Sequence, residues 1–217
     1  MSRATKTVIA LAALGAVALG ASACESPLVE TEVPARIGDG LPVDLGTGPD
    51  RPLRRLDIDQ LDASMRRATG GIGWDDGSGN PQLTRFRTTL GVPDFVTSTT
   101  EDLEVSALFL KFLDDAARST CDRLIEREED AATPADRTFL VHAELASTLP
   151  DDAEAIDQNL AYLLLRFHGR RVDVDSEELT PWRQLFRDAR AMSVDEPKTA
   201  WRTVCVALFD HPDFYLY

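Results

Sequence analysis

The chain has three histidines, His142, His168 and His211, and these side chains are the ones best able to do chemistry near neutral pH. An imidazole can bind zinc through a ring nitrogen or act as a general base. Two of the three also have structural explanations. His168 closes a predicted helix, where a cation suits the C-terminal dipole, and His211 precedes a proline at a helix end. The spacing does not favour a three-histidine metal site, and it does not exclude one.

Motifs of the common enzyme classes are missing from the sequence. It contains no nucleophile motif of the form glycine-x-serine-x-glycine, no phosphate-binding loop and no glycine-rich dinucleotide fingerprint. Pairs of carboxylates are frequent, but an acidic chain displays them as solvated surface. We therefore predict no catalytic residue and no cofactor. An enzyme using acidic residues near Trp74 and the loop 75–80 is kept as an alternative.

The same loop could supply oxygen ligands to calcium. Asp76, Ser78 and Asn80 have the alternate spacing with which an EF-hand loop begins. The glycine required at the next position is replaced by Pro81, and the glutamate required at the twelfth by Arg87. A plain surface loop is therefore the preferred interpretation, with these three residues as the calcium candidates.

The first 23 residues have the pattern of an export signal. Arg3 and Lys6 precede an apolar run over residues 8–20, which small residues follow. The run is too short to cross a bilayer, which takes about 20 apolar residues. We therefore assign residues 1–23 to a signal peptide.

The end of this signal, Ala21-Ser22-Ala23-Cys24, resembles the lipobox of bacterial lipoproteins. The resemblance implies that Cys24 is joined to diacylglycerol, becomes the first mature residue, and anchors the protein in a membrane through acyl chains such as palmitate. Leucine is more usual at the position of Ala21, and Ala21 and Ala23 also suit ordinary signal peptidase, so soluble export is the alternative. The predicted location is the cell envelope, facing the periplasm or the exterior. Glu25, rather than an aspartate, favours the outer membrane.

The other two cysteines, Cys121 and Cys205, form an even pair if Cys24 carries lipid. An exported protein lies in an oxidising compartment, so the pair is a disulfide candidate that would close a loop of more than 80 residues. Two free buried cysteines are the alternative. Neither cysteine belongs to a CxxC motif, so no zinc or redox site is predicted there.

Charge and composition limit the partners of the chain. The apolar fraction of 43% and the charged fraction of 28% are ordinary for a globular protein. The net charge is −14, and removal of the signal with Arg3 and Lys6 takes it to −16. Such a surface repels nucleic acid, because phosphate binding needs clustered cations. The charge is interpreted as a solvated surface, with a docking face for a basic partner as the alternative.

Residues 24–50 are rich in proline and glycine and are predicted to be a tether, and residues 51–217 a helical domain. Apolar residues recur at helical spacing in this domain, without sustained strand-like alternation. We therefore predict an all-α fold, an irregular bundle of five or six helices. The helical segments are 57–69, 99–130, 137–145, 151–169, 175–189 and 195–209.

Three details of these helices are predicted. Thr99 or Thr100 caps the second, with acidic residues in its first turn. Pro181 lies inside the fifth, which either kinks there or begins at Thr180. The sixth is apolar nearly all round and should be central. His211-Pro212 stops it, and Phe214, Tyr215 and Tyr217 should fold back on the core.

The C-terminal third contains four further motifs. In chain order they are Leu164-Leu165-Arg166-Phe167-His168-Gly169-Arg170-Arg171, Ser176-Glu177-Glu178-Leu179, Trp182-Arg183-Gln184-Leu185-Phe186 and Val206-Ala207-Leu208-Phe209-Asp210-His211-Pro212-Asp213-Phe214-Tyr215. They resemble helical domains of unknown function found beside cytochrome c modules in planctomycete and myxobacterial envelope proteins. Arg54-Arg55-Leu56 resembles the start of a companion domain. The chain departs from such modules in having no CxxCH, so it does not carry haem covalently. The resemblance implies an envelope protein associated with redox or polymer-processing systems.

Together these features predict a membrane-anchored envelope lipoprotein. Its helical domain is expected to bind or scaffold another envelope protein, of unknown identity, without catalysis. An accessory subunit of an envelope cytochrome system, or an envelope enzyme, is the alternative.

Overall fold

The fold of residues 53–217, the part that the computed structural model describes, is all-α, as predicted. Five helices have 12 or more residues, two have four, and no β-strand occurs between residues 53 and 217. No helix in this range is long and apolar enough to span a membrane. The elements are α1 (Ile58–Thr69), α2 (Gln82–Arg85), α3 (Ala107–Asp130), the 3₁₀ turn η1 (Pro134–Asp136), α4 (Ala153–His168), the 3₁₀ turn η2 (Glu177–Leu179), α5 (Thr180–Met192), α6 (Lys198–Asp210) and α7 (Pro212–Tyr215).

Local signals set the ends of several helices. Asp57 and Gln60 form a capping box at the start of α1, and Gly70 ends the helix with a left-handed φ of 70°. Gly169 ends α4 in the same way, with φ 67°. Pro181 occupies the first turn of α5, which begins at Thr180, so the second of the two predicted alternatives is confirmed.

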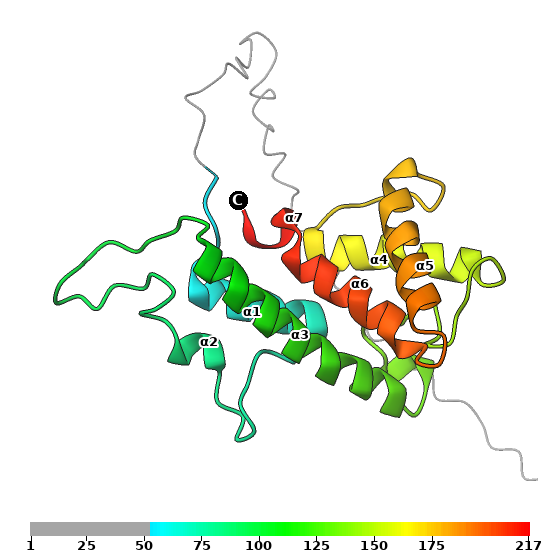
Figure 1. Cartoon of the computed structure of the whole chain (residues 1–217), viewed down its shortest axis with the longest axis horizontal. Coiled ribbons are helices and arrows are strands. Elements are labelled where there is room, and N and C mark those ends of the chain that lie inside the picture. Colours follow the sequence, from blue (N-terminus) through cyan, green and yellow to red (C-terminus); the bar gives the residue numbers. More distant parts are fainter. Residues whose placement is uncertain (1–52) are drawn as a thin grey trace, which may run out of the picture. The chain divides into compact units, whose positions relative to one another are not determined.

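Helix α6 is the central element of the domain, as its apolar sequence predicted. It lies between α3 and α5 and also contacts α4 and α7 (Figure 1). Trp201, Val204 and Leu208 on α6 are buried. Trp201 packs edge-on against Phe139 and at a tilt against Phe186. The core therefore forms around the last long helix of the chain.

The start of α3 differs from the prediction. The helix does not begin after Thr99 or Thr100 but at Ala107. Ser106 is the cap, and its hydroxyl oxygen accepts a hydrogen bond from the backbone N–H of Phe109 at 3.0 Å. The acidic residues before Ser106 are thus outside the helix.

A buried arginine explains this late start. The backbone N–H of Arg55 donates to the carbonyl of Leu103 at 3.1 Å, and its Nε donates to the carbonyl of Glu104 at 3.1 Å. Another guanidinium nitrogen of Arg55 donates to the carbonyl of Leu90 at 2.5 Å. The segment 101–106 remains irregular because the carbonyls of residues 102–104 bond to the backbone or side chain of Arg55 instead of continuing a helix.

The segment 137–145 is not helical, so this prediction was wrong. The carboxylate of Glu128 accepts hydrogen bonds from the backbone N–H groups of residues 138–140, at 3.0, 3.1 and 2.9 Å. The side chain of Asn159 accepts from the N–H of His142 at 3.0 Å. Both acceptors are buried, and they satisfy the backbone groups that a helix would otherwise pair.

The C-terminal residues return to the core only in part. Phe214 and Tyr215 on α7 are buried, as predicted. Tyr217 is 63% exposed, so the prediction was wrong for this residue. Its backbone pairs with that of Arg54, because the N–H of Tyr217 donates to the Arg54 carbonyl at 3.0 Å. The C-terminus therefore lies beside the start of the described domain.

Candidate functional site

The disulfide predicted between Cys121 and Cys205 is present, with the Cα atoms 5.8 Å apart. Both residues are completely buried, where α3 packs on α6. The bond therefore has a structural role at the centre of the domain. Cys24, the predicted lipidation residue, lies outside the described residues.

The calcium candidates lie in a closed surface loop. One carboxylate oxygen of Asp76 accepts hydrogen bonds from the backbone N–H groups of Ser78 and Asn80, both at 2.9 Å. The side-chain amide of Asn80 also donates to Asp76, at 3.1 and 3.2 Å. These bonds hold the pKa of Asp76 below its usual value. The carboxylate is satisfied by its own loop, and calcium binding there stays a prediction.

The structure brings two of the three histidines together. His168 is the last residue of α4 and His211 caps α7, and their rings stack with centroids 4.7 Å apart. The ring of Trp182 on α5 lies 5.9 Å from each of them. His142 is exposed and remote from this pair, with its ring against Tyr162.

Hydrogen bonding fixes where His168 carries its proton. Its Nε2 lies 2.9 Å from the carbonyl oxygen of Leu208. A carbonyl can only accept, so Nε2 bears the hydrogen and Nδ1 keeps a free lone pair. This Nδ1 is buried and has no hydrogen-bond partner among residues 53–217. Burial lowers the pKa of His168, which favours the neutral imidazole.

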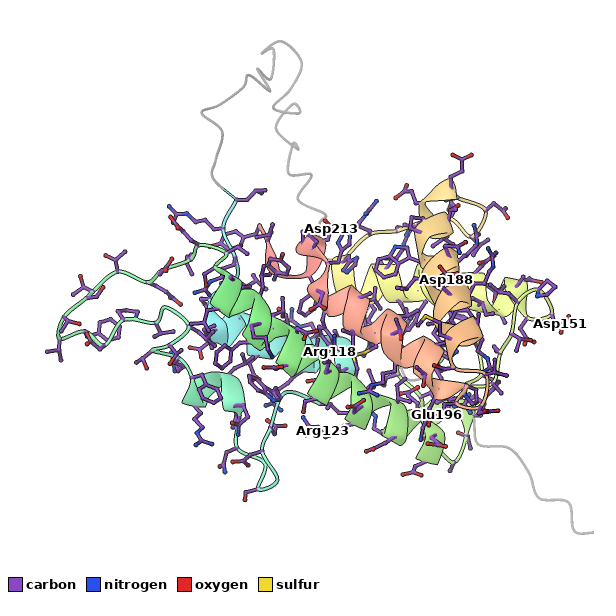
Figure 2. The ribbon with its side chains drawn as sticks, viewed as in Figure 1. Arg118, Arg123, Asp151, Asp188, Glu196 and Asp213 are labelled. Carbon is purple, nitrogen blue, oxygen red and sulfur yellow. A yellow bond between two sulfur atoms is a disulfide. The ribbon has the colours of Figure 1, made fainter. Side chains whose placement is uncertain are left out.

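Asp213, which Figure 2 labels on α7, is the third member of the group. Its backbone N–H donates to Nδ1 of His211 at 3.2 Å, and its Oδ2 lies 3.7 Å from that same nitrogen. Arg170 donates to Oδ2 of Asp213 at 3.2 Å and also pairs with Glu178. Each of His168, His211 and Asp213 can offer one ligand atom so that all three atoms lie within 4.8 Å of one another. We name these three residues the His-Asp cluster.

The grouping of these three residues was not predicted from the sequence. His211 and Asp213 are separated by one residue, and that spacing is the only local signal. The approach of His168 depends on how the end of α4 meets α7, which no short motif encodes.

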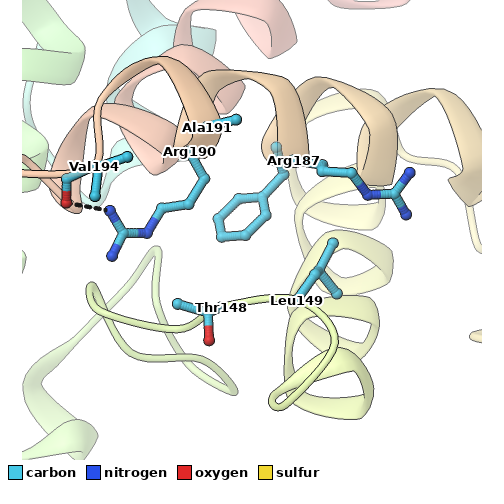
Figure 3. A pocket seen from close by; sticks show the side chains of 7 residues that line it. Thr148, Leu149, Arg187, Arg190, Ala191 and Val194 are labelled. Atoms are coloured by element: carbon cyan, nitrogen blue, oxygen red, sulfur yellow. Dashed lines mark hydrogen bonds between the residues drawn. The ribbon is translucent and has the colours of Figure 1, made fainter.

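A second candidate site is a groove along one side of α5. It has a volume of about 290 Å³, and Figure 3 shows it between α5 and the loop that carries Thr148 and Leu149, with Arg190 extending toward the loop and Arg187 extending along α5. The lining is mostly apolar, and Val194, at its end, is 71% exposed. We call this hollow the α5 groove; its lining residues are Thr148, Leu149, Phe186, Arg187, Arg190, Ala191 and Val194.

An adjoining hollow of about 420 Å³ extends the α5 groove, sharing Leu149 and Arg187 with it. Arg183 lines this extension and pairs with Asp157 at 2.5 Å. Arg187 instead donates to the side-chain oxygen of Gln184, at 2.9 Å.

Arg190 donates to the carbonyls of Ser193 and Val194, at 3.2 and 3.0 Å. In the described part of the chain, neither Arg187 nor Arg190 forms an ion pair with a carboxylate. The groove thus combines an apolar floor with two positive charges that form no ion pair with a carboxylate of residues 53–217.

No family model, no curated protein and no solved structure matches this chain. The resemblance of its C-terminal third to helical domains beside cytochrome c modules stays a prediction. The similarity of Arg54-Arg55-Leu56 to a companion domain also stays one.

Proposed function

We propose that the chain is a lipid-anchored protein of the bacterial cell envelope whose helical domain binds another envelope protein without catalysing a reaction. The observation that supports the exported part of this proposal is the buried disulfide between Cys121 and Cys205. Structural disulfides belong to oxidising compartments outside the cytosol. The bond also uses both cysteines of the domain, which leaves Cys24 as the single thiol for a lipid.

The α5 groove supports the binding part of the proposal. The chain as a whole is acidic, with a net charge of −14, yet Arg187 and Arg190 lie beside apolar side chains and form no ion pair within the described domain. An apolar pocket with a few well-placed polar groups is the usual form of a binding site. We assign to it an acidic amphipathic segment of a partner protein, which would place an apolar side chain on Leu149 and Phe186 and a carboxylate on the arginines.

The chemistry of the lining favours binding over catalysis. Arginine stays protonated at any physiological pH, so Arg187 and Arg190 can hold an anion but cannot exchange a proton with it. The remaining lining residues of the α5 groove are Thr148 and apolar side chains. A carboxylate held there would be oriented and not transformed.

Membrane fractionation of the expressed protein tests the anchor. The wild-type chain is expected in the membrane fraction, and mass spectrometry should find acyl chains on an N-terminal Cys24. The variant Cys24→Ser should move to the soluble fraction of the envelope. A wild-type protein whose mature N-terminus carries no lipid would refute the proposed anchor. It would not affect the proposal that the α5 groove binds a partner.

Binding of synthetic peptides tests the groove. The probe is a labelled peptide with leucine and glutamate at helical spacing, and the control peptide has lysine in place of glutamate. The double variant Arg187→Glu/Arg190→Glu should lose at least about tenfold in affinity for the acidic peptide, which corresponds to about 1.4 kcal/mol. Its matched control is Arg67→Glu/Arg171→Glu, which makes the same charge change at two exposed arginines away from the groove. Equal loss in both double variants, or equal binding of both peptides, would contradict a specific site.

A further inference from the structure

We infer that His168, His211 and Asp213 form a binding site for a first-row transition-metal ion of the zinc class. This site is distinct from the α5 groove and does not depend on lipidation. It joins the end of α4 to the turn between α6 and α7.

The spacing of the three donors suits a small ion. Zinc binds nitrogen at roughly 2.0–2.1 Å, so the donors around a tetrahedral ion stand roughly 3.4 Å apart. The donor atoms of the His-Asp cluster lie within 4.8 Å of one another. His211 is partly exposed and Asp213 is exposed, so rotation of these two side chains can close the remaining distance and release the histidine stacking.

His168 is already prepared as a ligand. Histidine ligands commonly donate their second ring N–H to a carbonyl or carboxylate, which fixes the tautomer and the ring orientation. The bond from Nε2 of His168 to the carbonyl of Leu208 has this form. It leaves Nδ1 as a buried lone pair that no other residue in the range 53–217 satisfies, which costs free energy unless something binds there.

The charges around the cluster fit a divalent ion. Arg170 bonds one oxygen of Asp213, as a group that orients a ligating carboxylate does, and Glu178 neutralises the arginine. Two imidazoles and a carboxylate are donors that suit zinc, copper and nickel. Calcium and magnesium require oxygen ligands, so they should not compete. Three protein ligands leave a fourth position for water or for a group from a partner.

Competition with a chromophoric zinc indicator tests the site on the purified protein. We expect one zinc ion to bind and to raise the melting temperature, and His211→Asn and Asp213→Asn each to weaken binding by at least tenfold. Asparagine keeps the capping capacity of residue 211, so the fold should survive. The matched control His142→Gln changes the remaining, exposed histidine and should bind zinc like the wild type.

Some outcomes would overturn the inference. No zinc binding to the wild type, or equal affinity in His211→Asn and His142→Gln, would mean that the cluster holds no metal and that any bound zinc sits on scattered surface carboxylates. Circular dichroism of each variant separates lost ligation from lost folding.

Copper quenching of tryptophan fluorescence gives an independent readout of position. The ring of Trp182 lies 5.9 Å from both histidine rings, so a bound Cu²⁺ ion should quench it strongly. Trp182→Phe should remove most of the copper-dependent quenching, and Trp74→Phe should leave it unchanged. Equal quenching in the two variants would contradict a site beside Trp182.

Discussion

Two charged residues, Arg55 and Glu128, are buried in this domain and bind backbone groups more than opposite charges. Arg55 is 2% exposed, donates to carbonyls of the loop before α3, and lies 4.7 Å above the ring of Phe109. Burial lowers its pKa. Glu128 is 1% exposed and accepts three backbone N–H bonds from the segment after α3. Each residue provides to an irregular segment the hydrogen bonds that a helix would provide to itself.

Removal of Glu128 should therefore destabilise the protein strongly. Glu128→Ala leaves three backbone N–H groups, two of them buried, without an acceptor, and we expect it to lower the free energy of unfolding by about 3–5 kcal/mol. Glu128→Gln keeps one acceptor oxygen, so its free energy of unfolding should lie between those of the alanine variant and the wild type. Urea unfolding measures both.

The matched control for this change is Glu129→Ala. The side chain of Glu129 is exposed and pairs with Lys198 at 3.3 Å, an interaction worth at most about 1 kcal/mol. If Glu128→Ala lowered the free energy of unfolding no more than Glu129→Ala does, the carboxylate of Glu128 would not be what orders residues 137–145.

At the scale of the element, local signals were predictable and distant ones were not. The cap at Asp57 and the stops at Gly70 and Gly169 act within one turn of their helices, so the sequence reveals them. The two errors, the start of α3 and the segment 137–145, share a cause. In each, the backbone bonds to a residue outside the segment, 10 or more positions away, and a pattern of apolar residues does not identify such a partner.

Of the candidate sites, one could be predicted from the sequence and two could not. The disulfide was predicted by counting cysteines, because assigning Cys24 to a lipid leaves Cys121 and Cys205 as an even pair. The His-Asp cluster and the α5 groove depend on how helix ends and loops meet. Their geometry therefore became visible only in the folded domain.

The pairing of α3 with α6 carries an electrostatic cost at Asp210, the last residue of α6. The pKa of Asp210 is raised to about 6, first by partial burial against the protein and second by the negative charge of Asp114 on α3, with Arg118 acting in the opposite sense. A helix C-terminus also disfavours a negative charge. Asp210 is only partly covered by the protein and remains accessible to solvent, so solvent screens much of this cost.

The sign of the resulting pH dependence follows from proton binding. Between the ordinary pKa of aspartate, about 4, and a pKa of about 6, the folded protein holds a proton that the unfolded chain has lost, so stability falls as the pH rises through this window. Asp210→Asn should therefore stabilise the protein by about 1 kcal/mol at about pH 7.5 and have little effect below about pH 4. Thermal unfolding at both pH values measures the difference. Asp195→Asn, at an exposed aspartate in the turn after α5, is the control and should show no such dependence.

At the scale of the whole molecule, the last long helix packs against helices from both halves of the domain. Helix α6 contributes to the contacts with α3, α4, α5 and α7, and it cannot do so until most of the domain has been synthesised. The disulfide spans 84 positions and fixes α6 to α3 at a buried point. The C-terminal residues then pair with Arg54, where the domain begins. These long-range connections make the bundle depend on its C-terminal half.

Loss of the disulfide should reveal this dependence. A cross-link across so long a loop restricts the unfolded chain, and Cys121→Ala/Cys205→Ala should lower the free energy of unfolding by about 2–5 kcal/mol. Reduction of the wild type should reproduce the loss, whereas the double variant should not respond to a reductant. Cys24→Ser is the control, because it removes a thiol outside the domain and should leave unfolding unchanged. A wild-type protein equally stable with and without reductant would show that packing around α6, and not the covalent bond, holds α3 and α6 together.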